Sequence, residues 1–276
     1  MNFQFQLHWS YKIKAAVISI ILTLFLLANL SSQQIFYNQE FQVNTYTNND
    51  QKNPVVAPLQ DGGFMVVWQS NEQDGSEWGI YGQLFDRNGI KKGEEFRVNS
   101  FTNRSQYNSS LTVLKNGKIV VCWQSLFQTG SFYDIIGQIF DGAGNKLGGE
   151  FPINTYIDDW QDFPSITALH DGGFVVCWRM WARDRVYYQI YDSLGVKKGD
   201  EVWMPVDFNN YTEGEYPIIH SLDDSGFMIC WTNDPISIYY SNIFGQIFDD
   251  FGNKKGEVFQ INTYTMGTNV FLRWHL

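Results

Sequence analysis

The sequence has few charged side chains, and positive ones are the scarcer. Charged residues make up 17% of the 276-residue chain, with 19 Lys and Arg against 29 Asp and Glu, a formal net charge of −10. A face that binds phosphates needs clustered Lys and Arg, so the composition argues against a nucleic-acid partner. Aromatic residues also make up 17% of the chain. That is enough apolar material for a sizeable core, which excludes general disorder.

Cysteine is also scarce. The three cysteines, Cys122, Cys177 and Cys230, each precede a tryptophan, and Val67 takes that place in a fourth equivalent stretch. An odd number leaves at least one thiol unpaired within the chain. Free cysteine behaves as a small buried apolar residue, which is what we expect here. The absence of a close pair such as C-x₂-C argues against a zinc site.

Helical periodicity is missing after residue 33, and the chain has one long apolar run. Residues 15–30 carry no charge and follow Lys12 and Lys14. This pattern predicts a secretory signal peptide in residues 1–32. A run this short falls below the roughly 20 residues of a membrane-spanning helix. The alternative is an uncleaved signal anchor, an N-terminal hydrophobic helix that would be the only contact with a membrane. Both interpretations predict an extracellular or secreted location for the rest.

A ten-residue stretch around tryptophan occurs four times. "DGGFMVVWQS" begins at Asp61, and "NGKIVVCWQS", "DGGFVVCWRM" and "DSGFMICWTN" follow along the chain. The shared tryptophans, predicted to be structural anchors, are spaced 55, 55 and 53 residues apart and are Trp68, Trp123, Trp178 and Trp231. A second motif of the type G-Q-x-F-D keeps the register and ends at Asp86, Asp141, Asp192 and Asp249. A regular period of this order indicates a propeller, solenoid or array.

Each copy contains four short strand patterns separated by Gly, Asp and Asn turns, which predicts an all-β protein. "FMVVW" from Phe64 is apolar on both faces, so both faces of its sheet must be covered. Sheets stacked around an axis provide this cover, and we expect a β-propeller-like array of four-stranded blades. The copies lie near residues 41–95, 96–150, 151–201 and 202–258, with a partial fifth in 259–276. Either four blades close a ring, or the chain stops short of a larger one.

The pattern "EFQVNTYT…DGGFMVVWQS…GIYGQLFD" resembles a tandem repeat of large secreted, adhesin-like proteins of bacteria and of single-celled eukaryotes. The resemblance covers residues 41 to about 265. The four-stranded, glycine- and tryptophan-marked copies are also similar to kelch blades, although the third strand differs. The resemblance implies a propeller scaffold without an agreed chemistry.

Ligand contacts are expected where the copies differ, chiefly in the loops between second and third strands. The predicted ligand-binding residues in these loops are Trp78, Phe132, Tyr133, Trp181, Arg183, Tyr239 and Tyr240. They would suit a glycan or an extracellular protein partner. Arg179 and Arg185 flank Arg183, and the sequence favours a solvated charge cluster over a carboxylate clamp. N-x-[ST] triplets predict glycosylation at Asn103, Asn108 and Asn210.

No cofactor or metal is expected, although Asp74, Ser76 and Glu77 could offer oxygen ligands to calcium. No G-x-S-x-G or H-E-x-x-H motif occurs, so no catalytic residue is predicted. The resulting hypothesis is a secreted or surface-anchored, non-enzymatic binding or adhesion module. The alternatives are a glycoside-active propeller enzyme and a truncated fragment of a longer repeat protein. The enzyme would need a cleft with two non-repeated carboxylates, for which the candidates are Asp158, Asp159, Asp184 and Glu213.

Overall fold

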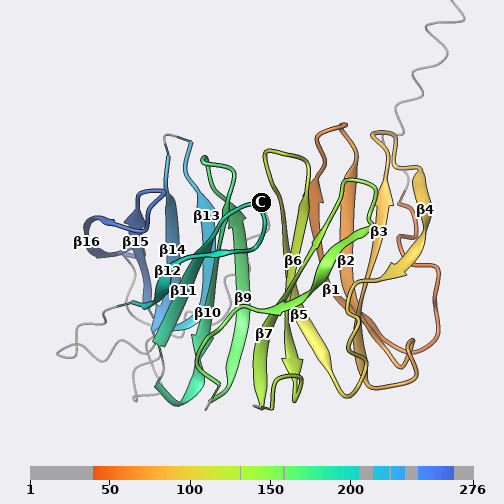
Figure 1. Ribbon diagram of the computed structural model, residues 1–276, viewed down its shortest axis with the longest axis horizontal. Helices are drawn as coiled ribbons and strands as arrows, with labels where there is room; N and C mark the ends of the chain where they lie inside the picture. The colour runs from red at the N-terminus through yellow and green to blue at the C-terminus, as the bar shows by residue number, and fades with distance from the viewer. Residues whose placement is uncertain are drawn as a thin grey trace, which may run out of the picture. The chain divides into compact units, whose positions relative to one another are not determined.

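The computed structural model describes residues 40–130, 132–157, 159–183, 185–204, 214–223, 225–233 and 242–263. Within them, sixteen strands form four four-stranded antiparallel sheets, and one 3₁₀ turn, η1 (Trp181–Arg183), lies between β10 and β11 of the third sheet. The all-β, propeller-like prediction is therefore confirmed (Figure 1). The N-terminal hydrophobic helix predicted in residues 1–32 lies outside the described residues. None of the described segments forms a helix long and apolar enough to cross a membrane.

Every sheet has its strands in sequence order. The first sheet is β1 (Gln51–Pro58), β2 (Phe64–Asn71), β3 (Trp78–Phe85) and β4 (Lys91–Arg97). The second is β5 (Gln106–Val113), β6 (Ile119–Leu126), β7 (Tyr133–Phe140) and β8 (Lys146–Pro152). The third is β9 (Gln161–Ala168), β10 (Phe174–Met180), β11 (Arg185–Tyr191) and β12 (Lys197–Trp203). The fourth is β13 (Glu215–Ser221), β14 (Phe227–Asn233), β15 (Asn242–Phe248) and β16 (Lys254–Gln260).

The fourth strand of each sheet crosses the boundary between two of the copies marked in the sequence. β4 runs through the boundary at residues 95 and 96, and β16 through that at 258 and 259. Phe259, which begins the partial fifth copy, thus belongs to the fourth sheet. Residues 264–276 lie outside the described residues, and closure of a ring stays a prediction.

The repeated Asp-Gly-Gly turns follow from backbone geometry. Gly172 has φ of +91°, a left-handed value that glycine adopts without a steric penalty. A Cβ on Gly173 would lie 2.2 Å from the carbonyl oxygen of Tyr191 on the next strand. The first glycine therefore serves the turn, and the second allows two strands to approach closely.

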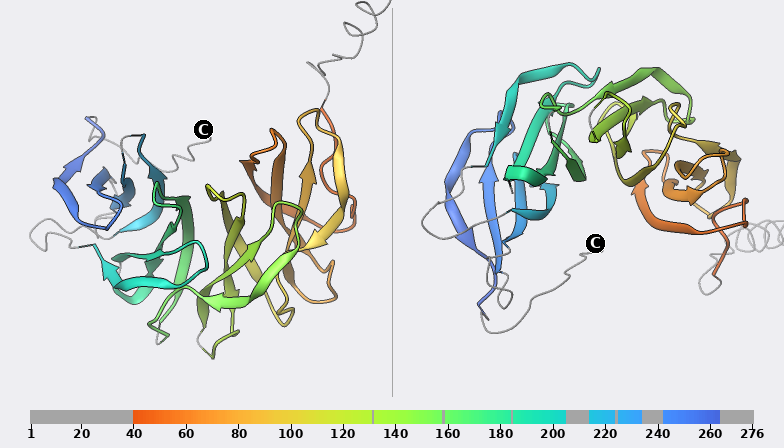
Figure 2. Two further views of the ribbon diagram at one scale, coloured as in Figure 1. Left: turned by 45° about the horizontal axis from the view of Figure 1, so that its top comes forward. Right: turned by 90° about the horizontal axis from the view of Figure 1, so that it is seen from below.

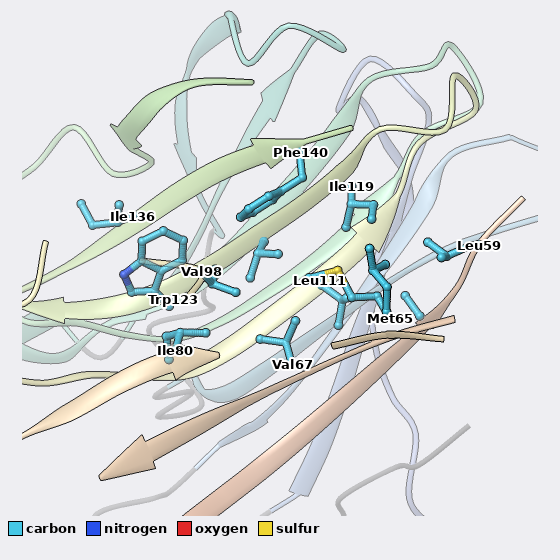
Figure 3. Packing of buried hydrophobic residues seen from close by; sticks show 13 residues of the cluster. Leu59, Met65, Val67, Ile80, Val98, Leu111, Ile119, Trp123, Ile136 and Phe140 are labelled. Carbon is cyan, nitrogen blue, oxygen red and sulfur yellow. The ribbon is translucent and has the colours of Figure 1, made fainter. Parts of the chain in front are cut away.

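The two apolar faces of each sheet pack in opposite directions. In β2, Met65 and Val67 face the second sheet, where they share a buried cluster with Trp123 and Phe140 (Figure 3). Trp68 points to the other face and belongs to a separate cluster. This alternation is the reason why the strand is apolar on both sides.

The same contact recurs along the chain. Trp178 shares a cluster with Cys122, and Trp231 shares one with Cys177, so each tryptophan packs on the preceding sheet. Full burial of one such side chain stabilises the fold by very roughly 1.5–3 kcal/mol. The three cysteines are free. Burial raises the pKa of the Cys177 thiol well above its usual value, as expected for a cysteine that serves as core.

The first strands β1, β5, β9 and β13 contact one another in sequence order, and we call them the inner strands. Figure 2 shows the sheets following one another along an arc. Hydroxyl groups join neighbouring inner strands: Ser110 Oγ accepts from the Ile166 amide at 3.3 Å, and Ser165 Oγ from the Ile219 amide at 3.2 Å. Equivalent ends of successive inner strands are thereby held side by side.

Candidate functional site

Two carboxylates share one arginine where β9 and β13 begin. Arg179, near the end of β10, lies opposite Asp162 in the β9–β10 ladder. Its Nε donates to Oδ1 of Asp162 at 2.8 Å and its Nη2 to Oδ2 at 2.7 Å, a bidentate contact. Its Nη1 donates to Oε1 of Glu215 at 2.6 Å. The guanidinium thus joins the inner strands of the third and fourth sheets.

The charges of this cluster do not balance. The side chains of Arg179, Asp162 and Glu215 are 8%, 10% and 23% exposed. Burial raises the pKa of Asp162, against the lowering effect of Arg179. Burial alone would lower the pKa of Arg179, but the hydrogen bonds that it donates to Asp162 and the charges of both acids raise it. One proton on either acid would neutralise the cluster, so the site can hold a carboxylic acid beside a carboxylate.

Aromatic residues in an unusual backbone conformation follow both acids. Phe163 and Tyr216 have φ of +52° and +48°, and their ring centroids are 4.7 Å apart. Asn53 and Asn108, which tolerate this region better, hold the place in the first two sheets. The Arg179 guanidinium lies 5.1 Å from the Phe163 centroid. The unfavourable residues thus occur in the two sheets that carry the acids, where strain points to a functional site.

A second group of side chains, the aromatic row, lies on the loops beside the acids. Its ring contacts run from Phe127 to Phe132 (4.8 Å), from Phe132 to Trp160 (5.6 Å) and from Trp160 to Trp181 (5.3 Å). Tyr133 meets Trp160 edge-on at 5.5 Å. Phe132 and Trp181 are each 51% exposed, Phe127 is 39% and Trp160 is 38%. The second and third sheets together present these rings to solvent.

Tyr107 of β5 connects the aromatic row with the acids. Its ring lies 5.8 Å from that of Tyr133. Burial raises the pKa of Tyr107, and Tyr133 and the charge of Asp162 raise it further. The phenol therefore stays protonated beside the acidic cluster and can donate a hydrogen bond.

Three of the predicted loop residues, Phe132, Tyr133 and Trp181, lie together in the aromatic row. Trp78 begins β3 in the first sheet, with the Lys52 ammonium 5.5 Å from its ring centroid. Arg183 ends η1. Tyr239 and Tyr240 lie outside the described residues.

The sequence did not identify Asp162, Glu215 or Trp160. Of the acids considered, Asp158, Asp184 and Glu213 lie outside the described residues. Asp159 accepts hydrogen bonds from the amides of Trp160 at 2.7 Å and Ala182 at 2.6 Å. The available signal was a break in the repeat inside strands, where Arg179 replaces the Gln69 and Gln124 of the first two copies.

The prediction of a solvated arginine cluster is wrong for Arg179, because the β9–β10 register buries it against Asp162. Arg185 also has a partner: its guanidinium lies 4.2 Å from the ring centroid of Trp203. The arginines therefore point to different neighbours although they are close in sequence.

Two further predicted sites have contacts of their own. The Asn108 amide donates to Gln124 at 3.1 Å from a half-buried position on β5, and its glycosylation stays a prediction. Asn103 is exposed in the link between the first two sheets, and Asn210 lies outside the described residues.

The loop proposed for calcium is bonded internally. Asp74 Oδ1 accepts from the Ser76 amide at 3.1 Å, and Glu77 accepts from the Ser105 hydroxyl. Among the described residues, no group of three or more His, Cys, Asp or Glu could hold a metal ion.

The opposite ends of the inner strands surround a pocket of about 330 Å³, lined in part by Leu59, Lys115 and His170. None of the described residues that line it carries a carboxylate. The two carboxylates of the candidate site lie at the other end of the inner strands, where β9 and β13 begin.

No family model matches the chain, and no curated protein matches it. Solved structures share its fold. A protein of unknown function from Dyadobacter fermentans is 13% identical with a TM-score of 0.58, over 80% of this chain and 67% of that one. A thermostable family-43 glycoside hydrolase is 12% identical with a TM-score of 0.52, over 80% and 79%. A mutant α-L-arabinofuranosidase from Fusarium graminearum with an iminosugar inhibitor is 17% identical with a TM-score of 0.53, over 79% and 68%.

The hypothesis of a non-enzymatic binding or adhesion module is contradicted by these comparisons. Two of the three similar structures are glycoside-cleaving enzymes. The alternative, a glycoside-active propeller enzyme, agrees with them better. The motif search could not reveal such an enzyme, because glycoside cleavage needs two carboxyl groups placed in space and no local sequence motif.

Proposed function

We propose that the protein is a glycan-cleaving enzyme whose acidic pair is Asp162 and Glu215. The observation that supports this most directly is the Asp162–Arg179–Glu215 cluster at the start of two inner strands. These acids do not recur in the first two sheets, where Lys52 and Tyr107 hold the place of Asp162. A role in shape alone would not require them.

The cluster offers the two groups that hydrolysis of a glycosidic bond requires. One carboxyl must protonate the leaving oxygen and the other must act as base or nucleophile. Burial raises the pKa of Asp162, although the shared guanidinium lowers it, and this favours Asp162 as the acid. Glu215 is the more exposed of the two. We assign Asp162 to protonating the leaving oxygen, and Glu215 to acting as the base or nucleophile.

The test is hydrolysis of neutral glycans by the purified full chain. Aryl glycosides of arabinofuranose, xylose, mannose and glucose, with arabinan and xylan, are assayed for released phenol and reducing sugar. Asp162→Asn and Glu215→Gln keep the size of each side chain and remove its acidity. Each should lower kcat/KM on the cleaved substrate by about 10²–10⁴-fold.

Glu257→Gln is the matched control, because Glu257 is an exposed carboxylate on β16, in another part of the fold. It should retain full activity. Urea unfolding of all variants separates loss of catalysis from loss of structure. Absence of cleavage on the whole panel, or full activity of both site variants, would contradict the proposal.

A further inference from the structure

The aromatic row is not explained by the fold. Phe127, Phe132 and Trp160 take the places that Glu72, Glu77 and Ser105 hold one copy earlier in the chain. The backbone is the same in both: the Phe127 amide donates to the Phe132 carbonyl at 3.0 Å, and the Glu72 amide donates to the Glu77 carbonyl. The same loop conformation therefore forms with polar side chains in the first sheet, so the large exposed rings of the second sheet are not needed for the loop to form.

The rings are held in place by their backbone. Phe127 has φ of +59°, which is unfavourable for a bulky residue, and its ring contacts that of Phe132. The Trp181 amide donates to the Trp160 carbonyl at 2.9 Å, and Asp159 binds the amides of Trp160 and Ala182. A surface ordered before the ligand arrives binds at a lower cost in conformational entropy.

The row is continuous with the acidic pair. Trp160 precedes Asp162 by two positions, and Trp181 follows Arg179 by two. Trp181 begins η1, and its amide donates to the Trp160 carbonyl at 2.9 Å, so this pair comes directly after the last pairs of the β9–β10 ladder, which include Arg179 and Asp162. A ligand that lies on the indole rings can therefore reach the acids.

We propose that the aromatic row binds a neutral polysaccharide and guides it to Asp162 and Glu215. Flat rings with exposed faces offer an apolar surface to the C–H faces of sugar rings, while water remains free to solvate the hydroxyls at their edges. The net charge of −10 disfavours a polyanion. Binding by the row stands independently, whereas the guiding role rests on the proposed function.

The binding test uses affinity electrophoresis in gels that contain linear arabinan, arabinoxylan or mixed-linkage β-glucan. The full chain carries Glu215→Gln, so that the polymers are not cleaved during the run. At least one polymer should retard this protein. Adding Trp181→Ala or Phe132→Ala should weaken the apparent affinity by about tenfold or more, and Trp181→Phe should retain most of it.

Phe251→Ala is the matched control, since Phe251 is an exposed aromatic residue at the β15–β16 turn. It should leave the retardation unchanged. Failure of every polymer to retard the protein, or equal retardation of all variants, overturns the proposal.

The outcomes separate this proposal from the function. Cleavage of short aryl glycosides without retardation by any polymer would support the proposed enzyme and contradict binding by the aromatic row. Retardation that depends on Trp181, with no cleavage of any glycoside, would support the aromatic row as a binding site and contradict the proposed enzyme. If both hold, Trp181→Ala should raise KM for the polymer, and Phe251→Ala should leave kcat/KM for the short glycosides unchanged.

Discussion

Asn154 completes the second sheet by accepting a hydrogen bond from the backbone N–H of Ile135 through its Oδ1, at 2.8 Å. Its Nδ2 donates to the carboxylate of Asp134 and to the carbonyl of Tyr156. Asn99 and Asn262 bind Ile80 and Ile243 of their own sheets through the same atom. These three asparagines thus tie the segment that follows a fourth strand to the third strand of the same sheet.

Replacement of Asn154 by alanine should destabilise the protein. The Ile135 amide is buried, and without its acceptor it would pay the desolvation penalty of about 1–3 kcal/mol. Urea unfolding followed by tryptophan fluorescence measures this loss. Asn103→Ala, at an exposed link position, should change the free energy of unfolding by less than about 0.5 kcal/mol. Equal midpoints for the two variants would show that the Asn154 contact contributes nothing.

Gly173 should tolerate no side chain. Its Cβ would lie 2.2 Å from the Tyr191 carbonyl oxygen, which is backbone and cannot move aside without separating β10 from β11. We expect Gly173→Ala to lower the free energy of unfolding by more than about 2 kcal/mol. Gly149 on β8 has no atom within 4 Å of an added Cβ, so Gly149→Ala is the control and should be close to neutral. A stable Gly173→Ala protein would mean that the two strands are farther apart than described.

Acid should weaken the turns that join third and fourth strands. Asp141 accepts from the side chain and backbone of Asn145, and these bonds lower its pKa. Burial alone would raise the pKa of Asp249, but hydrogen bonds from Asn253 lower it. A carboxyl whose pKa is lower in the folded state stabilises the fold above its unfolded pKa of about 4, and this stability is lost as the pH falls through the folded pKa.

Unfolding midpoints measured from pH 7 to pH 2 test this. The double variant Asp141→Asn and Asp249→Asn keeps an oxygen acceptor in each turn and no longer titrates there. Its stability should fall less steeply below pH 4 than that of the unaltered protein. Parallel curves would assign the acid sensitivity to other carboxylates.

The architecture could be predicted because its causes are local and repeated. The alternation of Met65 and Val67 with Val66 and Trp68 requires cover on both faces of a strand wherever it occurs. Four occurrences at a constant spacing then specify four equivalent sheets. Residues before position 40 lie outside this test.

The acidic site could not be predicted in the same way, because it depends on strand register. Asp162 meets Arg179 because the ladder shifts between Cys177 and Arg179, where Phe163 adopts its left-handed backbone. A bulge of this kind leaves little trace in a hydrophobic pattern. Glu215 joins them only because β13 packs beside β9 in the neighbouring sheet. The sequence prediction placed the site in the loops, whereas Asp162 and Arg179 are charged residues inside strands.

Removal of the shared cation should expose the energetics of the acidic pair. Arg179→Met keeps much of the side-chain volume but removes the guanidinium that Asp162 and Glu215 share. The free energy of unfolding at pH 7 should fall by about 3–5 kcal/mol, because one partner of a buried ion pair is removed. The variant's acids should bind protons more tightly when folded than when unfolded. Its deficit relative to the unaltered protein should therefore shrink as the pH falls toward 4.

Adding Asp162→Asn should restore part of the loss at pH 7. Urea unfolding at both pH values decides the matter: an equal deficit at pH 7 and pH 4 would mean that packing, and not charge, holds Arg179 in place.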